Sequence, residues 1–136
     1  MQPDQPLTST AGAPGECPVL VVHGDGAARA LIADALRLEG FPAVSASHWD
    51  ALGALDRLGG EAPRALLLDL DGRDAAGGGV VAIVTALRNL HQGVPIIGLS
   101  TVPTVRDGSA VGVVALLPEP FDLDQLLEAV ARYSHN

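Results

Sequence analysis

Five short aliphatic segments alternate in this chain with segments of helical periodicity, and this alternation constrains the fold more than any other feature. The aliphatic segments are predicted strands at residues 18–22, 42–46, 64–69, 94–99 and 112–117. The third and fourth are continuous apolar runs, as is typical of parallel strands buried on both faces. Parallel strands need long crossover connections, which helices usually provide. The sequence therefore predicts an α/β fold in which helices cover both faces of a parallel five-stranded sheet.

The helical segments carry start and stop signals. A first helix is predicted over 26–39, because Asp25 is a good N-cap and Gly40 can adopt the positive φ that is common after a helix. Its apolar face is predicted to contain Leu31, Ile32, Ala35 and Leu36. A second helix is predicted over 48–58, with Ser47 as its N-cap and Trp49 packed at its start.

The second half of the chain follows the same pattern. A third helix is predicted over 80–90, whereas Pro103 and Gly108 favour only a short helix between the last two strands. In the final helix Asp122 is the predicted N-cap, and Gln125 completes a capping box. The apolar stripe of this helix is predicted to contain Leu123, Leu126, Leu127, Val130 and Ala131.

Composition limits the number of domains and the classes of partner. The 136 residues suit one domain with one core. Residues 1–16 are rich in Pro, Gly, Ser and Thr and are expected to form a flexible tail, followed by a single domain over 17–136. A net charge of −8 disfavours direct binding to nucleic acid.

The sequence gives no sign of a membrane or secreted protein. No apolar stretch approaches the roughly 20 residues that a membrane span needs, and the N-terminal residues lack the features of a signal peptide. Cys17 is the only cysteine, so no intramolecular disulfide can form. We therefore expect a cytoplasmic protein that does not contact the membrane.

Polar residues follow four of the predicted strands. His23, Asp69, Ser100 and Glu119 stand at or just after strand ends. The carboxyl ends of parallel strands meet at one edge of the sheet, and ligands of open α/β sheets bind there. The four side chains are therefore predicted to converge. No Ser-His-Asp or Cys-His arrangement is visible, so we do not expect an enzyme.

Taken together, these segments resemble the receiver domain of bacterial two-component response regulators. The third strand ends in Asp69, the fourth runs into Ser100-Thr101, and the fifth runs into Glu119-Pro120. The resemblance covers residues 18–133 and implies a three-layer, doubly wound sheet of flavodoxin-like order 2-1-3-4-5. It also implies that Asp69 is equivalent to the phosphoacceptor and Ser100 to the switch hydroxyl that follows the phosphoryl oxygen.

The chain departs from this family where the phosphoryl group and its metal would be held. The family ends its first strand with two acids that bind Mg²⁺ and its last strand with Lys-Pro. Here His23 and Gly24 replace the acids, and Glu119 replaces the lysine. Mg²⁺ prefers oxygen ligands, so this donor set suits it poorly and no metal cofactor is predicted.

Three further residues belong to the altered pocket. Asp25 is directed by its position toward the helix cap, and Asp71 stands two residues after the acceptor, where the family's backbone carbonyl binds metal. Leu116 stands where the family often has a switch aromatic. The degenerate acidic pocket is therefore predicted to comprise His23, Gly24, Asp25 and Asp71 beside Asp69.

Several roles for these residues remain open from the sequence. Asp69 could serve only as a strand-end acid. His23 could pair with it as a built-in cation, which would allow pH sensing, or could bind a transition metal together with Asp69 and Asp71. The other histidines, His48, His91 and His135, are predicted to lie on the surface. The Glu119-Pro120 bond is predicted to be cis.

The sequence favours a degenerate receiver, or pseudo-receiver, that acts in signal transduction as a phosphorylation-independent protein-interaction module. Its partner surface is predicted at Val113, Val114 and Leu116, since the fifth strand is an uncharged sheet edge. The partner is expected to be another signalling or output protein, or a second copy bound through the fourth helix, fifth strand and fifth helix. The alternatives are a receiver phosphorylated on Asp69 by a histidine kinase and a ligand-gated receiver-like module.

Overall fold

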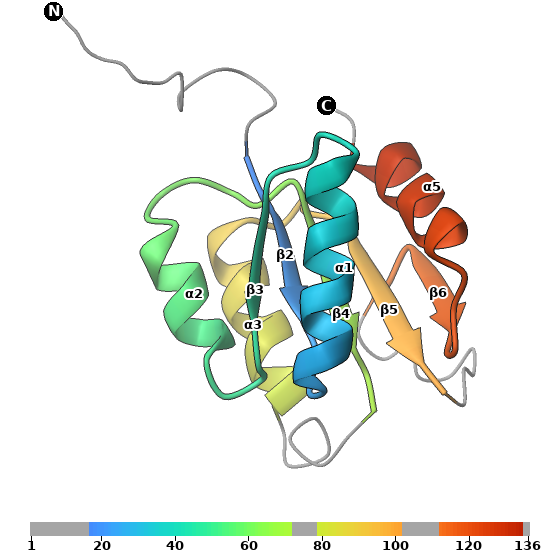
Figure 1. Cartoon of the computed structure of the whole chain (residues 1–136). Coiled ribbons are helices and arrows are strands. Elements are labelled where there is room, and N and C mark those ends of the chain that lie inside the picture. The colour runs from blue at the N-terminus through green and yellow to red at the C-terminus, as the bar shows by residue number, and fades with distance from the viewer. Residues whose placement is uncertain (1–16, 72–78, 102–111, 135–136) are drawn as a thin grey trace, which may run out of the picture.

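A single parallel sheet organises the chain (Figure 1). The computed structural model describes residues 17–71, 79–101 and 112–134. The strands are β2 (Val19–Val22), β3 (Ala43–Ala46), β4 (Ala65–Asp69), β5 (Ile96–Ser100) and β6 (Ala115–Pro118). They lie in the order β3-β2-β4-β5-β6, which is 2-1-3-4-5 when the strands are counted along the chain. The predicted α/β fold class and strand order are confirmed.

Helices cover the sheet on both faces. They are α1 (Gly26–Leu38), α2 (Ala51–Arg57), α3 (Val80–Leu90) and α5 (Leu123–Tyr133). Leu66 and Leu68 of β4 pack with α2 and α3, whereas Leu67 between them packs with α1 and α5. Successive strand residues point to opposite faces, so this central strand contributes to both cores. None of the helices within the described residues is both long and apolar enough to cross a membrane.

The predicted helix caps at Asp25 and Asp122 are present. The Asp25 carboxylate accepts the Ala27 N–H at 3.0 Å, and the Asp122 carboxylate accepts the Asp124 N–H at 2.8 Å. Gly40 has a φ of 93° after α1, as predicted. The Glu119-Pro120 bond is cis, also as predicted. The capping role of Gln125 stays a prediction.

The second predicted helix begins later than the sequence indicates. The Ser47 hydroxyl accepts the Asp50 N–H at 3.2 Å, the bond expected of an N-cap. This bond closes a turn ahead of α2, however, and the N-cap of α2 is Asp50. Trp49 lies in that turn and is 81% exposed, so the prediction that it packs at the helix start is wrong.

The apolar faces of two helices also differ in detail from the prediction. In α1 the buried residues are Ile32, Ala33 and Leu36, while Leu31 is 54% exposed. Leu31 and Leu36 are five residues apart, which is about 140° around a helix of 3.6 residues per turn, so one buried face does not hold both. In α5 Ala131 is exposed, and Ala129 packs against the core in its place.

The last strand is shorter than predicted. It begins at Ala115, and the φ of 70° at Gly112 shows that this predicted first residue is not in the extended conformation. Val113 and Val114 therefore precede β6, although the Val114 N–H still donates to the Ile96 carbonyl at 2.8 Å. The expected tail over 1–16 and the expected short fourth helix fall at positions 1–16 and 102–111, outside the described residues.

Gly98 in β5 provides a stability test of the packing next to β6. A Cβ added there would lie 2.8 Å from Leu70 Cδ1 and 3.0 Å from Leu116 Cδ1. Gly98→Ala is expected to lower the free energy of unfolding by about 1–3 kcal/mol, because overpacking forces neighbours off their rotamers. Urea denaturation measures the change. Gly93→Ala is the control, since its added Cβ would meet nothing within 4 Å; an equal loss in both variants would contradict the packing argument.

Candidate functional site

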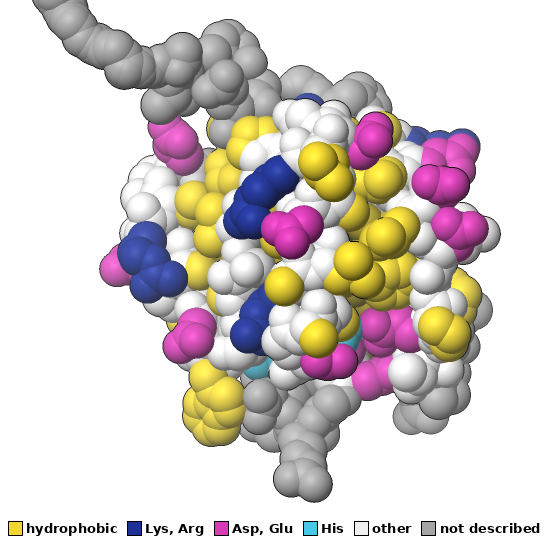
Figure 2. Space-filling model, viewed as in Figure 1, with side chains coloured by type: hydrophobic (Ala, Val, Ile, Leu, Met, Phe, Trp, Pro, Cys, Tyr) yellow, Lys and Arg dark blue, Asp and Glu magenta, His cyan; other side chains and the backbone are white. Residues whose placement is uncertain are grey.

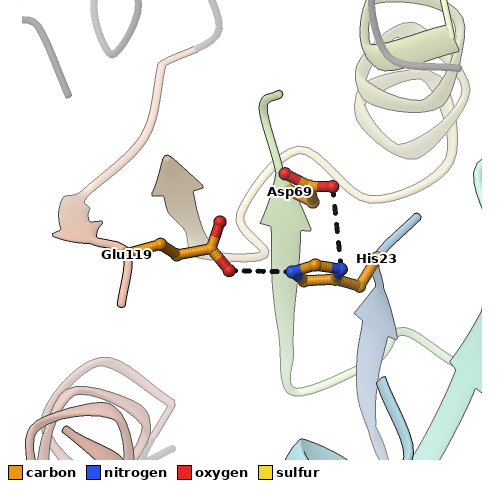
Figure 3. Close-up of side chains that lie close together, drawn as sticks. All are labelled: His23, Asp69 and Glu119. Carbon is orange, nitrogen blue, oxygen red and sulfur yellow. Dashed lines mark hydrogen bonds and ion pairs between the residues drawn. The ribbon is translucent and has the colours of Figure 1, made fainter. Parts of the chain in front are cut away.

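The strand register brings four polar side chains to one edge of the sheet. Val22 pairs with Leu68, so the next residues, His23 and Asp69, are neighbours across β2 and β4. Ser100 pairs with Pro118, so Ser100 lies beside Glu119. His23, Asp69 and Ser100 are buried, and Asp69 is only 4% exposed. The predicted convergence of these residues is therefore present, and Figure 3 shows His23 between the two carboxylates.

His23 is bound to Glu119 rather than to Asp69. Its Nε2 lies 2.8 Å from Glu119 Oε2. Its Nδ1 accepts the Asp25 N–H at 3.0 Å. A backbone N–H can only donate, so Nδ1 carries a lone pair and the ring proton lies on Nε2, where it donates to Glu119. His23 Nδ1 is 3.7 Å from Asp69 Oδ2, which is close enough for an ion pair but not for a hydrogen bond.

Asp69 is held by the backbone on either side of it. Its Oδ2 accepts the Gly24 N–H at 3.2 Å, and its Oδ1 accepts the Asp71 N–H at 3.0 Å. A Cβ added at Gly24 would lie 3.6 Å from Asp69 Oδ2, in ordinary contact, so the position has room for a side chain. The Asp25 side chain caps α1, as predicted from its position, and contributes no carboxylate to the pocket.

The Asp71 carboxylate is hydrogen-bonded to the Ser100 hydroxyl, the group that the resemblance assigns to phosphoryl binding. Its carboxylate accepts the Ser100 hydroxyl at 2.9 Å and the Thr101 hydroxyl at 2.6 Å, and it also accepts the Thr101 N–H. Burial alone would raise the pKa of Asp71, but the hydrogen bonds from Thr101 and Ser100 outweigh it and hold that pKa below its ordinary value. The Ser100 hydroxyl is thus engaged by a carboxylate of the chain itself.

The lowered pKa of Asp71 gives a pH-dependent contribution to stability. The carboxylate is charged more readily in the folded than in the unfolded chain, so its contribution is fully present above the unfolded value near 3.8. That contribution is lost as the pH falls through the lower folded value. Asp71→Asn is expected to flatten the fall in unfolding free energy below about pH 4. Denaturation curves from pH 3 to 7 measure this, and an unchanged slope in the variant would contradict the assignment.

His48 is a site residue that the sequence analysis missed. It is 5% exposed, and its Nε2 lies 2.8 Å from the Asp69 carbonyl oxygen, so this nitrogen donates. Its Nδ1 is buried without a hydrogen-bond partner among the described residues. The prediction of a surface histidine is therefore wrong. His48 stands two residues after β3, at the same edge of the sheet, and the strand-end argument applied to the second strand would have found it.

The predicted partner surface is only partly exposed. Val114 is exposed, whereas Val113 and Leu116 are half-buried and pack over Gly98. The fourth helix of the predicted dimer surface falls in residues 102–111, outside the described part of the chain, as does His135. Leu116 lies within β6 and pairs with Gly98 of β5, and its equivalence to the switch residue stays a prediction.

The donor set of the pocket does not fit Mg²⁺. Among the described residues, one cluster offers ligand atoms that all lie within 4.8 Å of one another, and it consists of His23, Asp69 and Glu119. Asp71 is not part of it, because its carboxylate is turned toward Ser100 and Thr101. The alternative ligand set of His23, Asp69 and Asp71 is therefore wrong in its third member. A cluster with an imidazole and no acid at Gly24 is a poor match for an ion that prefers octahedral oxygen ligands.

Comparison with known proteins gives structural rather than sequence matches. No protein-family model matches the sequence, and no curated protein matches it. The structure of a chemotaxis response regulator of Vibrio cholerae is similar with a TM-score of 0.73 and 23% identity, covering 86% of this chain and 98% of that one. A putative pilus assembly-related protein from Burkholderia pseudomallei gives a TM-score of 0.67 and 22% identity, with 88% and 90% covered.

Two further structures extend the comparison. An orphan response regulator of H. pylori has a TM-score of 0.70 at 16% identity, covering 89% of this chain and 98% of that one. NtrX from Brucella abortus in complex with ATP has a TM-score of 0.72 at 25% identity. The match covers 87% of this chain but only 27% of NtrX. With the strand order 2-1-3-4-5 and the convergence of strand ends on Asp69, these likenesses lead to one conclusion: the chain has the fold of a response-regulator receiver domain.

Proposed function

We propose that this chain is a bacterial, cytoplasmic signalling module that binds another protein without being phosphorylated on Asp69. The observation that carries the proposal is the contact between Glu119 and His23, whose Oε2 and Nε2 atoms lie 2.8 Å apart. The family the chain resembles has a lysine where Glu119 stands. Glu119 thus places a carboxylate where the family has a cation. His23, which replaces the first of the family's two acids, holds that carboxylate across the pocket.

Electrostatics oppose phosphorylation at this site. Phosphoryl transfer depends mainly on positioning and on neutralising the charge of the phosphoryl oxygens. Asp69, Asp71 and Glu119 bring three carboxylates to the pocket, and the sequence contains no lysine at all. At about 4 Å, each pair of like unit charges costs roughly 1 kcal/mol in water and several times more in a shielded cleft. Glu119 would therefore repel the group that the family's lysine attracts.

The hydroxyl that would read out the phosphoryl group is also engaged. Ser100 donates to Asp71 at 2.9 Å, and Thr101 donates to the same carboxylate. In the family, this hydroxyl follows a phosphoryl oxygen. Here the Asp71 carboxylate supplies an internal acceptor in its place, which supports one fixed arrangement of the β5 end rather than a phosphorylation-dependent one.

The proposed partner surface is the edge formed by β6 and α5. A shallow hollow of about 320 Å³ lies there, between the edge strand and the helix. It is lined by Ala115, Leu117, Pro118, Gln125, Ala129 and Tyr133, and by the charged Glu128 and Arg132 of α5. Edge strands of natural sheets are usually protected by charge or by covering elements. An uncharged β6 edge supports a protein partner or a second copy of the chain as its cover.

Amide NMR spectra with Mg²⁺ and beryllofluoride test the proposal, since beryllofluoride mimics a phosphorylated aspartate. We expect the signals of residues near Asp69 and Ser100 to stay unchanged. Asp69→Asn in the producing organism is expected to leave the signalling output as it is, whereas deletion of the gene changes it. Saturable shifts that disappear in Asp69→Asn would instead establish a phosphorylated receiver, and the proposal would fail.

A further inference from the structure

We propose that His23, Asp69 and Glu119 form a binding site for one divalent transition-metal ion of the zinc class. The inference goes beyond the proposed function, because metal binding is a property of the isolated chain. The three side chains come from the ends of β2, β4 and β6, three strands of one sheet (Figure 3). Each offers one ligand atom, and these atoms all lie within 4.8 Å of one another.

The distances suit such an ion. Zinc lies about 2.0–2.2 Å from imidazole nitrogen and carboxylate oxygen, so ligand atoms around a tetrahedral ion are about 3.3 Å apart. The separation of 2.8 Å between His23 Nε2 and Glu119 Oε2 is below this value, and the 4.8 Å limit of the cluster is above it. Glu119 is a long side chain at the half-buried rim of the pocket, so a rotation of its carboxylate can adjust its separation from His23 Nε2.

The charge of the cluster also favours a divalent cation. Asp69 and Glu119 are carboxylates in a shielded pocket, and among the described residues His23 is the one basic side chain within 4.0 Å of them. The hydrogen bonds of that histidine fit its neutral form, with the proton on Nε2 and a lone pair on Nδ1. Buried charges need pairing or a metal ion. Figure 2 shows acidic side chains gathered beside a histidine at this end of the molecule.

The ligand types select the class of ion. Imidazole nitrogen suits zinc, cobalt, nickel and copper, whereas Mg²⁺ requires oxygen ligands in octahedral geometry. Gly24 removes the carboxylate that the family uses for Mg²⁺, and Glu119 adds one on the opposite side of His23. The pocket therefore differs from the family's magnesium site and offers mixed nitrogen and oxygen ligands.

His23 can bind the ion through Nε2 and keep its one ring proton, which then lies on Nδ1. The ion replaces the proton on Nε2, and the ring proton moves to Nδ1, which faces Asp69 Oδ2 at 3.7 Å. The Asp25 N–H donates to Nδ1 in the ion-free chain, so this hydrogen bond must break when the ring proton moves to Nδ1. Metal-bound histidines commonly donate their other N–H to a carboxylate. Asp69 Oδ2 would have to approach Nδ1 from 3.7 Å to accept it.

His48 provides an independent indication of a ligand beside Asp69. Its side chain is more than nine-tenths buried, and its Nδ1 has no hydrogen-bond partner among the described residues. Its Nε2–H is fixed by the Asp69 carbonyl, which leaves the Nδ1 lone pair available. A Cβ added at Gly24 would lie 4.0 Å from this nitrogen and 3.6 Å from Asp69 Oδ2, so both atoms lie beside the same point of the pocket. A water molecule bound to the ion is the partner that this lone pair would accept from.

Titration of the EDTA-treated chain with Zn²⁺ by calorimetry, and with Co²⁺ by visible absorption, tests the inference. We expect one equivalent to bind, with the absorption of four- or five-coordinate Co²⁺, and an excess of Mg²⁺ not to displace it. Glu119→Gln and His23→Gln are expected to weaken binding at least tenfold. His91→Gln is the control, because His91 lines a separate cavity with Cys17 at the other end of the sheet, and it should bind as the unchanged chain does.

Nitrogen NMR of the histidine rings locates the ion. The inference requires Zn²⁺ to shift the His23 Nε2 resonance and to move the ring proton to Nδ1. Equal affinity in Glu119→Gln, loss of binding in His91→Gln, or displacement by Mg²⁺ would overturn it. The test uses neither a partner nor beryllofluoride, so it is separate from the proposed function. If the chain binds both Zn²⁺ and beryllofluoride, this inference stands and the proposed phosphorylation independence fails. If it binds neither, this inference fails and the proposed phosphorylation independence stands.

Discussion

A variant with His23→Asp, Gly24→Asp and Glu119→Lys is expected to bind beryllofluoride when Mg²⁺ is present, whereas the unchanged chain should not respond. The two aspartates supply oxygen ligands for Mg²⁺, and the lysine supplies the cation for the phosphoryl oxygens. Gly24 accepts a Cβ without a clash among the described residues, since that Cβ would be 3.6 Å from Asp69 Oδ2. Amide NMR titration measures the response as saturable shifts around Asp69.

The matched controls separate charge from folding. The same triple variant with Asp69→Asn should lose the response, because position 69 then has no carboxylate to bear the mimic. Variants with only Glu119→Lys, or only the two aspartates, should respond weakly or not at all, since metal and lysine neutralise the phosphoryl charge together. A well-folded triple variant that ignores beryllofluoride would contradict the prediction. The bond between Asp71 and Ser100 would then be the next obstacle to remove.

The fold could be predicted from the sequence because its signals are repeated and local. Continuous apolar runs such as Leu66–Leu68 are typical of buried parallel strands, and the alternation with helices leaves few arrangements. Details that depend on neighbours in space were less accessible. The rotation of α1 places Leu31 outward, and the positive φ of Gly112 delays the start of β6. Neither is encoded in the periodicity of its own segment.

The residues that form the site could be predicted better than the hydrogen bonds between them. Strand ends of a parallel sheet must converge, which placed His23, Asp69 and Glu119 together. Which carboxylate His23 binds depends on the Asp25 N–H that fixes its ring, and a sequence pattern does not reveal such a bond. The hydrogen bonds of Asp71 to Ser100 and Thr101 were hidden for the same reason. His48 was missed because it follows a half-buried strand at the sheet edge, where the apolar signal is weaker.

Leu67→Ala is expected to cause the largest loss of stability among these substitutions. Leu67 is fully buried in β4, between the strands that carry His23 and Ser100, and it packs against the core under α1 and α5. Removing a buried leucine side chain costs about 2–5 kcal/mol, through lost transfer energy and the cavity left behind. Small domains have only about 5–15 kcal/mol in total. Urea denaturation followed by circular dichroism measures the loss.

Leu38→Ala is the matched control, because it is the same substitution at a residue that is 86% exposed. Its effect should stay within about 0.5 kcal/mol, as is usual for surface substitutions away from special features. Equal losses in both variants would contradict the assignment of the core. The comparison also bears on the site: the strands that carry His23, Asp69 and Ser100 are held in register by this core, so the pocket geometry depends on its packing. In Leu67→Ala, the apparent affinity for Zn²⁺ should therefore fall as the folded fraction of the chain falls. In Leu38→Ala, that affinity should not change.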